Sequence, residues 1–179
     1  MFRFANRSEE PAFSRQLKEQ LGVDKHQLGE GWRWVIVEGP RKEAYLAPQE
    51  VASSLERLLK QRMPYSLGLF AGGVDHEELQ VSLELASSLG HFLPKRKLVL
   101  LRDEAEQPVL YGRDVLAGSI QHIERNVNRG ELVVLANRAS EILALGQMLS
   151  NADELVRATL KQRVVRNLID KGWYLRKGG

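Results

Sequence analysis

Val164 to Arg176, the stretch VVRNLIDKGWYLR, joins an apolar pair to an Asp-Lys-Gly turn and an aromatic closure. It lies within the last twenty-five residues, where seven basic side chains stand against one acid, Asp170. A disordered basic tail would lack the interleaved apolar residues. A folded basic face suits a phosphate backbone, because each Lys or Arg that meets a phosphate releases condensed counterions. The stretch therefore predicts a nucleic-acid surface or, alternatively, a solvated strand-and-turn surface.

Charge is unevenly distributed along the chain. The 179 residues carry a net charge of +3, with 15 Lys and Arg against 16 Asp and Glu in residues 1–106, and 11 against 7 in residues 107–179. This asymmetry indicates a neutral half and a half that faces nucleic acid. An apolar content of 43% is enough for a core in each half.

Several classes of protein and site are disfavoured. The chain has no cysteine, which excludes disulfides, thiol nucleophiles and cysteine-based zinc sites. No apolar run approaches the roughly 20 residues of a membrane span, and the N-terminus lacks the pattern of a signal peptide. We therefore expect a soluble intracellular protein with no membrane partner.

Catalytic motifs are also missing from the sequence. It contains no Walker A motif, no Gly-x-Gly-x-x-Gly and no Gly-x-Ser-x-Gly. Asp75-His76-Glu77-Glu78 carries metal-capable side chains, but they are consecutive after a Gly-Gly pair and predict a loop tip rather than a metal site. We expect no enzymatic activity, no cofactor and no metal. An RNA-modifying enzyme would need Asp75, His76 and Glu78 gathered in a cleft.

The first half reads as a mixture of helices and strands. Phe13, Leu17 and Leu21 share one helical face, in a helix that Ser8 would cap and Gly22 would end. Alternation predicts a strand over residues 32–37. The further expected elements are a strand at 44–46, a helix opened by Pro48, a strand at 66–70 that ends in an Ala71-Gly72-Gly73 turn, a strand at 79–83, a helix at 85–92 and a strand at 97–101.

A polar stretch ending in Pro108 marks a domain boundary, which we place near Glu106. Beyond it, short apolar runs separated by turn signals are typical of a small β-barrel. They lie at 109–111, 120–123, 132–135, 142–148, 164–165 and 173–175, with one helix at about 151–160. The prediction is an α+β protein of two domains, an antiparallel sheet with helices over residues 1–106 and a β-barrel over residues 107–179.

The second half resembles a PUA domain, a small RNA-binding β-barrel. Four stretches carry the resemblance: Leu110-Tyr111-Gly112-Arg113-Asp114-Val115-Leu116, Gly130 to Leu135, Leu143 to Gln147, and the closing Asp170 to Arg176. Within PUA proteins the chain is similar to the archaeal type of the Nip-seven family, through Ser66-Leu67-Gly68, Leu93 to Val99 and Glu106-Gln107. It departs from that family at Ile142 to Gly146, where the usual Pro-Leu-Gly-Phe-Gly keeps only its last glycine.

The resemblance implies a function and a set of partners. Members of that family are ribosome-biogenesis factors required for large-subunit assembly and processing of ribosomal RNA. We therefore expect a monomeric protein whose barrel binds single-stranded, U-rich ribosomal RNA and whose first domain docks pre-ribosomal assembly proteins. The location would be cytoplasmic in an archaeon and nucleolar or nuclear in a eukaryote.

The predicted RNA-binding residues follow from the basic segment and the glycine-containing loop. Arg guanidinium forms bidentate contacts with phosphate, and Lys supplies a point charge. Arg157 and Lys161 would share a face if their segment is helical, whereas Arg163 and Arg166 need a turn between them to reach the same surface. The complete set is Tyr111, Gly112, Arg113, Arg157, Lys161, Arg163, Arg166, Lys171, Arg176 and Lys177.

Other interpretations stay open. An equally good interpretation is that Tyr111 packs in the core and Gly112 only turns the chain. Lys95-Arg96-Lys97 could extend the RNA surface or begin a solvated strand. Trp32 and Trp34 share one strand face and suit core packing better than base stacking. At the level of function, the alternatives are a protein–protein adaptor in an RNA-processing complex and an accessory RNA-binding subunit of an RNA-modification enzyme.

Overall fold

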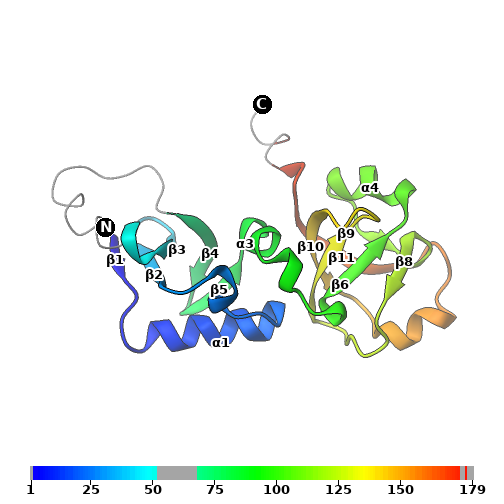
Figure 1. Ribbon diagram of the computed structural model, residues 1–179. Coiled ribbons are helices and arrows are strands. Elements are labelled where there is room, and N and C mark those ends of the chain that lie inside the picture. Colours follow the sequence, from blue (N-terminus) through cyan, green and yellow to red (C-terminus); the bar gives the residue numbers. More distant parts are fainter. Residues whose placement is uncertain (1, 52–67, 174–175, 177–179) are drawn as a thin grey trace. The chain divides into compact units, whose positions relative to one another are not determined.

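Two compact units, residues 1–92 and 93–179, make up the computed structural model, which describes residues 2–51, 68–173 and 176 (Figure 1). The first unit holds a sheet in the order β1-β2-β3-β4-β5, and the second a sheet in the order β7-β11-β10-β9-β6-β8. Neighbouring strands are antiparallel except for the parallel pair β6 and β9. Within the described ranges, no helix is long and apolar enough to cross a membrane.

The first unit packs helices against an antiparallel sheet, as the sequence predicts. Its elements are β1 (Phe2–Phe4), α1 (Glu9–Leu21), the 3-10 turn η1 (Lys25–Leu28), β2 (Trp32–Val37), β3 (Lys42–Pro48), β4 (Leu69–Asp75), β5 (Glu78–Val81), α3 (Leu83–Ser88) and η2 (Gly90–Phe92). The helix expected after Pro48 falls mostly in residues 52–67, outside the described residues.

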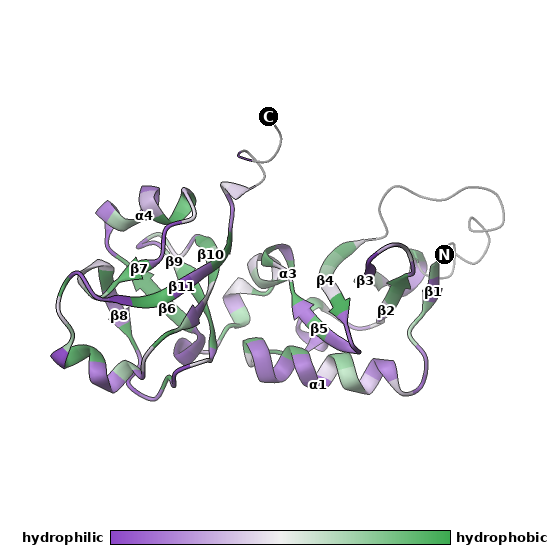
Figure 2. Ribbon diagram, turned by 180° about the vertical axis from the view of Figure 1, so that it is seen from behind, coloured by the Kyte–Doolittle hydropathy of each residue, from purple (hydrophilic) through white to green (hydrophobic). Residues whose placement is uncertain are grey.

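Helix α1 buries the predicted face and shows banded hydropathy (Figure 2). Phe13 is buried beside Trp34 of β2, with their ring centroids 5.6 Å apart, so Trp34 is a core residue. Gly22 ends the helix with a left-handed φ of 73°. The predicted capping by Ser8 is wrong, because its side chain makes no cap bond. Asn6 takes this part, and its Oδ1 accepts from the backbone N–H groups of Ser8 and Glu9, each at 2.9 Å.

The turn expected at Ala71-Gly72-Gly73 is also wrong. Strand β4 continues through both glycines to Asp75, and the chain reverses at His76 and Glu77, which have positive φ values of 46° and 67°. Asp75-His76-Glu77-Glu78 is therefore the tip of the β4–β5 hairpin, as expected.

The second unit is a nearly closed, barrel-like sheet. Its elements are η3 (Lys95–Lys97), β6 (Leu98–Leu101), α4 (Asp103–Leu110), β7 (Val115–Leu116), η4 (Ala117–Ser119), β8 (Ile120–Ile123), β9 (Leu132–Ala136), β10 (Ile142–Met148), η5 (Ala152–Arg157) and β11 (Arg163–Asp170). A continuous apolar core joins these strands, with Val99, Leu101, Val133, Leu135 and Val164 almost fully buried in it.

Four expectations change in this unit. The boundary near Glu106 moves to between Phe92 and Leu93, because β6 pairs with both β8 and β9 of the second sheet. The apolar run at 109–111 ends helix α4 rather than forming a strand. The helix expected at 151–160 is only the 3-10 turn η5. Trp173, the first residue of the strand expected at 173–175, is helical instead, and the Arg176 N–H donates to the Gly172 carbonyl at 3.1 Å, while the rest of that expected strand lies outside the described residues.

Candidate nucleic-acid interface

The segment after β11 is held to the barrel by an ion pair whose carboxylate is buried. Asp170 is 2% exposed, and its two carboxylate oxygens accept from Arg176 Nη1 at 3.0 Å and Nη2 at 2.7 Å. Arg176 Nη1 also donates to the carbonyl of Leu110. These hydrogen bonds to the Asp170 carboxylate raise the pKa of Arg176. Arg176, predicted to contact RNA, therefore uses its guanidinium to fix the end of the barrel.

Two glycines allow the loop after α4 and the turn after β11 to meet. A Cβ on Gly172 would lie 2.0 Å from the Leu110 carbonyl oxygen, so no other residue permits this approach. Gly112 has a φ of 81°, in the left-handed region that favours glycine. Tyr111-Gly112 and Asp170-Lys171-Gly172, which are distant in sequence, form one locked structure at this end of the barrel.

Strand β11 also holds the loop that follows α4 (Figure 1). Asn167 Nδ2 donates to the carbonyls of Val109 at 2.8 Å and Arg113 at 3.3 Å. The backbone N–H of Asn167 donates to Asp114 Oδ1 at 3.0 Å, while Asp114 Oδ2 lies 3.4 Å from Arg163 Nη1. Asn167 therefore fixes the backbone of Arg113, and Asp114 contacts the side chain of Arg163.

A β-bulge brings Arg163 and Arg166 to the same side of β11. Arg163 pairs with Leu116 of β7 and Val165 pairs with Val115, so Val164 is an extra residue in the strand. A bulge shifts the alternation of side chains by one position. Val164 and Val165 are consequently both buried, and both arginines are exposed. The turn that the sequence required between the two arginines is supplied by this bulge.

The other predicted residues lie on the surface. Tyr111 is 63% exposed, which excludes its packing in the core. Arg113 and Lys171 are also exposed. Arg157 ends η5 and Lys161 follows in a turn, so the shared helical face expected for them is wrong, although both are exposed. Lys177 lies outside the described residues.

Six exposed cations lie on β11 or on segments that adjoin this strand, and we call them the basic rim. Backbone hydrogen bonds join its segments, since Ala117 N donates to Gln162 O at 2.9 Å and Gly118 N to Leu160 O at 3.0 Å. Arg163 keeps a side chain that is 71% exposed despite its contact with Asp114. In the part of the chain that the structure describes, the other members make no ion pair. The rim consists of Arg113, Arg157, Lys161, Arg163, Arg166 and Lys171.

Three exposed apolar side chains, which sequence reasoning missed, lie in the same part of the chain as these cations. Val156, Leu160 and Leu168 are 81%, 76% and 49% exposed. Their spacing fits a buried face as well as an exposed one, so only the structure distinguishes the two. With Tyr111, they provide surface on which unpaired bases can pack.

The basic run at Lys95-Arg96-Lys97 has a structural role. Lys97 is buried, and its Nζ lies 3.3 Å from both Glu131 Oε2 and the Leu132 carbonyl. Burial lowers the pKa of Lys97, against the opposing effect of Glu131. Arg96 contacts the same carboxylate at 3.0 Å. Two of the three cations are thus committed to Glu131 within the second unit.

The residues Asp75 to Glu78, which an RNA-modifying enzyme would need in a cleft, lie on an exposed hairpin tip. The side chains of Asp75 and His76 are 71% and 96% exposed on the β4–β5 hairpin tip. Among the described residues, no group of three or more His, Asp and Glu side chains is arranged to hold a metal ion.

Comparison with known proteins identifies the second unit. Residues 97–179 match the UPF0113 PUA domain family. A UPF0113 protein of Aeropyrum pernix is 31% identical over 160 residues, which cover 89% of this chain and 83% of that protein. PUA domains generally bind RNA.

The likeness extends to other proteins and to a solved structure. A probable tRNA pseudouridine synthase B of Methanocaldococcus jannaschii is 28% identical over 104 residues, 57% of this chain and 30% of that protein. A conserved PUA-domain protein from Thermoplasma acidophilum superposes with a TM-score of 0.67 at 16% identity, covering 99% of each chain. Both units therefore share their fold with that protein.

Proposed function

This chain belongs to the UPF0113 PUA-domain family, and we propose that it is a non-enzymatic RNA-binding protein whose second unit holds single-stranded RNA. The observation that carries the proposal is the basic rim. Its cations come from three segments that hydrogen bonds hold together, and five of the six make no ion pair with described acids. Cations without protein partners are available to phosphates.

Single-stranded RNA fits this surface better than a duplex. Tyr111 and Leu168 are exposed close to the cations, and unstacked bases can pack on such side chains. A duplex hides its base faces and would use the cations alone. The rim therefore combines electrostatic attraction to the backbone with contacts that only an open strand offers.

The biological setting that we propose is assembly of the large ribosomal subunit and processing of its RNA. The support is the likeness of Ser66 to Gly68, Leu93 to Val99 and the barrel motifs to the Nip-seven family. In this proposal the first unit docks assembly proteins, the protein acts as a monomer, and it works in the cytoplasm of an archaeon. The match to UPF0113 relatives from archaea agrees with that setting.

A second candidate is binding of transfer RNA as part of an RNA-modification system. The observation in its favour is the 28% identity with the probable tRNA pseudouridine synthase B. The shared segment covers only 30% of that protein, so the likeness does not support a catalytic role for this chain. The two candidates differ in the RNA that binds most tightly, a U-rich single strand or a folded tRNA.

Replacement of Arg163 and Arg166 by alanine tests the site. Both arginines are exposed, so the variant should fold, and loss of two phosphate contacts should reduce affinity for a U-rich single strand roughly tenfold at physiological salt. The slope of log affinity against log salt should become less negative by about 1.4. Fluorescence anisotropy with labelled RNA measures both quantities.

The matched control is Arg125→Ala with Arg129→Ala. These arginines are exposed in the loop between β8 and β9 of the same unit and remove the same charge. Their loss should leave most of the affinity. Equal weakening by the two double variants would show that net charge, and not the basic rim, governs binding.

A further inference from the structure

Arg176 fixes the end of the barrel with three of the five N–H donors of its guanidinium. Asp170 accepts one hydrogen bond from Nη1 at 3.0 Å and one from Nη2 at 2.7 Å, and the Leu110 carbonyl accepts the second N–H of Nη1. One N–H of Nη2 and the N–H of Nε have no acceptor among the described residues. Because Asp170 bridges both Nη atoms, these two remaining N–H groups lie in parallel along one edge of the guanidinium plane.

Gly112 leaves space beside this edge. A Cβ on Gly112 would lie 3.0 Å from Nη2 and 3.6 Å from Cζ of Arg176, so any other residue would place atoms there. The side chain of Arg176 is 34% exposed, although that of Asp170 is only 2% exposed. The exposed part of the guanidinium is consequently the part that Asp170 and Leu110 leave free.

The ion pair has no net charge of its own, but its neighbours in the chain supply positive charge. Arg113 comes directly after Gly112 and is exposed. Lys171 comes directly after Asp170 and is also exposed. Tyr111, on the other side of Gly112, is 63% exposed and offers an aromatic face. A phosphate that carries an unpaired base fits these surroundings better than a free anion does, because the base can use the aromatic face.

We infer that Arg176 is a phosphate-binding residue of the RNA site, in which Nε and Nη2 donate to two oxygens of one phosphodiester while Asp170 holds the guanidinium in place. This inference rests on the proposed function, because the phosphate belongs to the bound single strand. The parallel N–H groups of a guanidinium match two phosphate oxygens. A side chain that is already fixed loses little freedom when it binds. The basic rim thus supplies general attraction, whereas Arg176 specifies where one phosphate lies.

Gly112→Asn tests the site without changing the net charge. Asparagine tolerates a left-handed φ, and its side chain fills the space beside Nη2. The variant should bind a U-rich single-stranded RNA of about ten nucleotides roughly fivefold more weakly than wild type, because one bidentate phosphate contact is lost. Fluorescence anisotropy measures the affinity, and urea unfolding checks that the variant folds.

The matched control is Gly130→Asn, in the loop between β8 and β9. Gly130 also has a left-handed φ, of 86°, and a Cβ there would meet nothing within 4 Å. The same side chain is thus added to the same kind of backbone in the same unit, away from Arg176. This control should keep the affinity of wild type. Equal weakening by the two substitutions would overturn the inference.

A single uncharged linkage in the RNA identifies the phosphate itself. The same RNA is made as a series in which one methylphosphonate replaces each phosphodiester in turn. Wild type should show one position at which this replacement weakens binding by roughly fivefold more than elsewhere. With Gly112→Asn, or with Arg176→Lys, which keeps a cation for Asp170 but has no guanidinium edge, that position should become equivalent to the others.

The series separates binding by Arg176 from a role confined to the fold. A purely structural role would make the variants weaken every RNA of the series alike, without dependence on the position of the neutral linkage. That result would overturn the inference and leave the proposed function intact. Failure of wild type to bind the unmodified RNA would contradict both.

Discussion

Asp170 fixes the segment after β11, because both oxygens of its buried carboxylate accept hydrogen bonds from the Arg176 guanidinium. In the sequence it is the one acid of a basic segment and enters only as a reduction of the charge. In the structure it is buried, and its carboxylate binds the guanidinium of Arg176. Both residues are visible in the sequence, but their pairing depends on the path of the chain after β11, where Trp173 is helical although the aromatic and apolar pattern at 173–175 predicted a strand.

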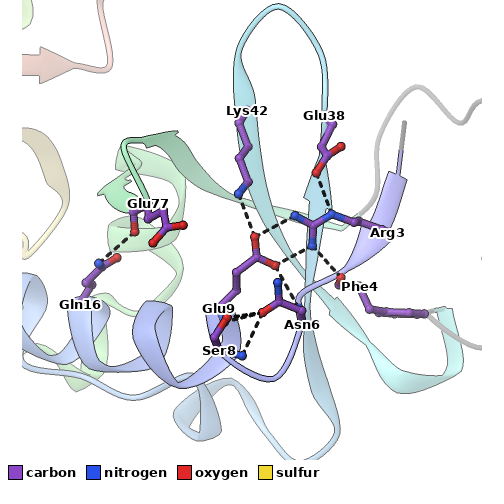
Figure 3. A network of polar contacts seen from close by, with 9 residues as sticks. All are labelled: Arg3, Phe4, Asn6, Ser8, Glu9, Gln16, Glu38, Lys42 and Glu77. Atoms are coloured by element: carbon purple, nitrogen blue, oxygen red, sulfur yellow. Dashed lines mark hydrogen bonds and ion pairs between the residues drawn. The ribbon is translucent and has the colours of Figure 1, made fainter.

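Glu9 is a second residue whose contacts determine the pKa of its side chain (Figure 3). Its carboxylate accepts from Arg3 Nη1 at 2.6 Å and Nη2 at 2.8 Å, from Lys42 Nζ at 2.8 Å and from the Asn6 backbone N–H at 3.0 Å. The hydrogen bonds from Arg3 hold the pKa of Glu9 well below its usual range, against the opposing effect of burial. This network ties β1 and β3 to the start of α1.

The depressed pKa of Glu9 predicts a loss of stability in acid. A carboxylate whose pKa is lower in the folded than in the unfolded state stabilises the fold above the unfolded value of about 4.3, and this stabilisation falls as the pH decreases below it. Glu9→Gln should lower the free energy of unfolding by about 1–3 kcal/mol at pH 7, through lost charge-assisted hydrogen bonds. Urea unfolding measured from pH 7 to pH 3 should show the difference from wild type narrowing. A difference that stays constant over this range would contradict the assigned role.

At the scale of the element, apolar spacing predicts helices and strands well, whereas bulges and turns depend on the strand that pairs alongside. Apolar periodicity located α1 and β2, because a helix or strand with one buried face has its apolar residues at a regular spacing. The bulge at Val164 was not predicted, since an extra residue in one strand is visible only once its partner strand is known. Likewise, Ala71-Gly72-Gly73 has the composition of a turn but lies inside β4.

Substitution by alanine should have different effects on stability at the adjacent residues Gly72 and Gly73. Gly72 has a φ of 146°, and a Cβ there would lie 1.9 Å from the Gln80 carbonyl oxygen. Gly72→Ala should therefore destabilise the first unit by about 1–3 kcal/mol. At Gly73 a Cβ would meet nothing within 4 Å, so Gly73→Ala should change stability by less than about 1 kcal/mol.

Thermal or urea unfolding of the two alanine variants side by side provides the measurement. Each variant is the natural control for the other, because both add one methyl group to the same strand. Equal stability of the two variants would be incompatible with the backbone geometry of β4.

For the whole molecule, the charge asymmetry is larger when the chain is divided between the two structural units than at the boundary expected from the sequence. Residues 93–179 hold 15 Lys and Arg against 10 Asp and Glu, whereas residues 1–92 hold 11 against 13. The two-domain organisation could be predicted, but the boundary could not, because a polar stretch with a proline resembles a linker even when it forms helix α4. Of the predicted RNA-binding residues, most lie on the basic rim, and Arg176 does not, because buried Asp170 binds it.

The most direct test of RNA binding is fluorescence anisotropy of the intact chain with three labelled probes, a U-rich single-stranded RNA, a duplex RNA and a single-stranded DNA, across a salt series. The account predicts tightest binding to the single-stranded RNA. It also predicts a slope of log affinity against log salt of about −4 if all six rim cations meet phosphates. Weak binding to all three probes, without preference, would contradict it and would leave the basic rim as a generic charged surface.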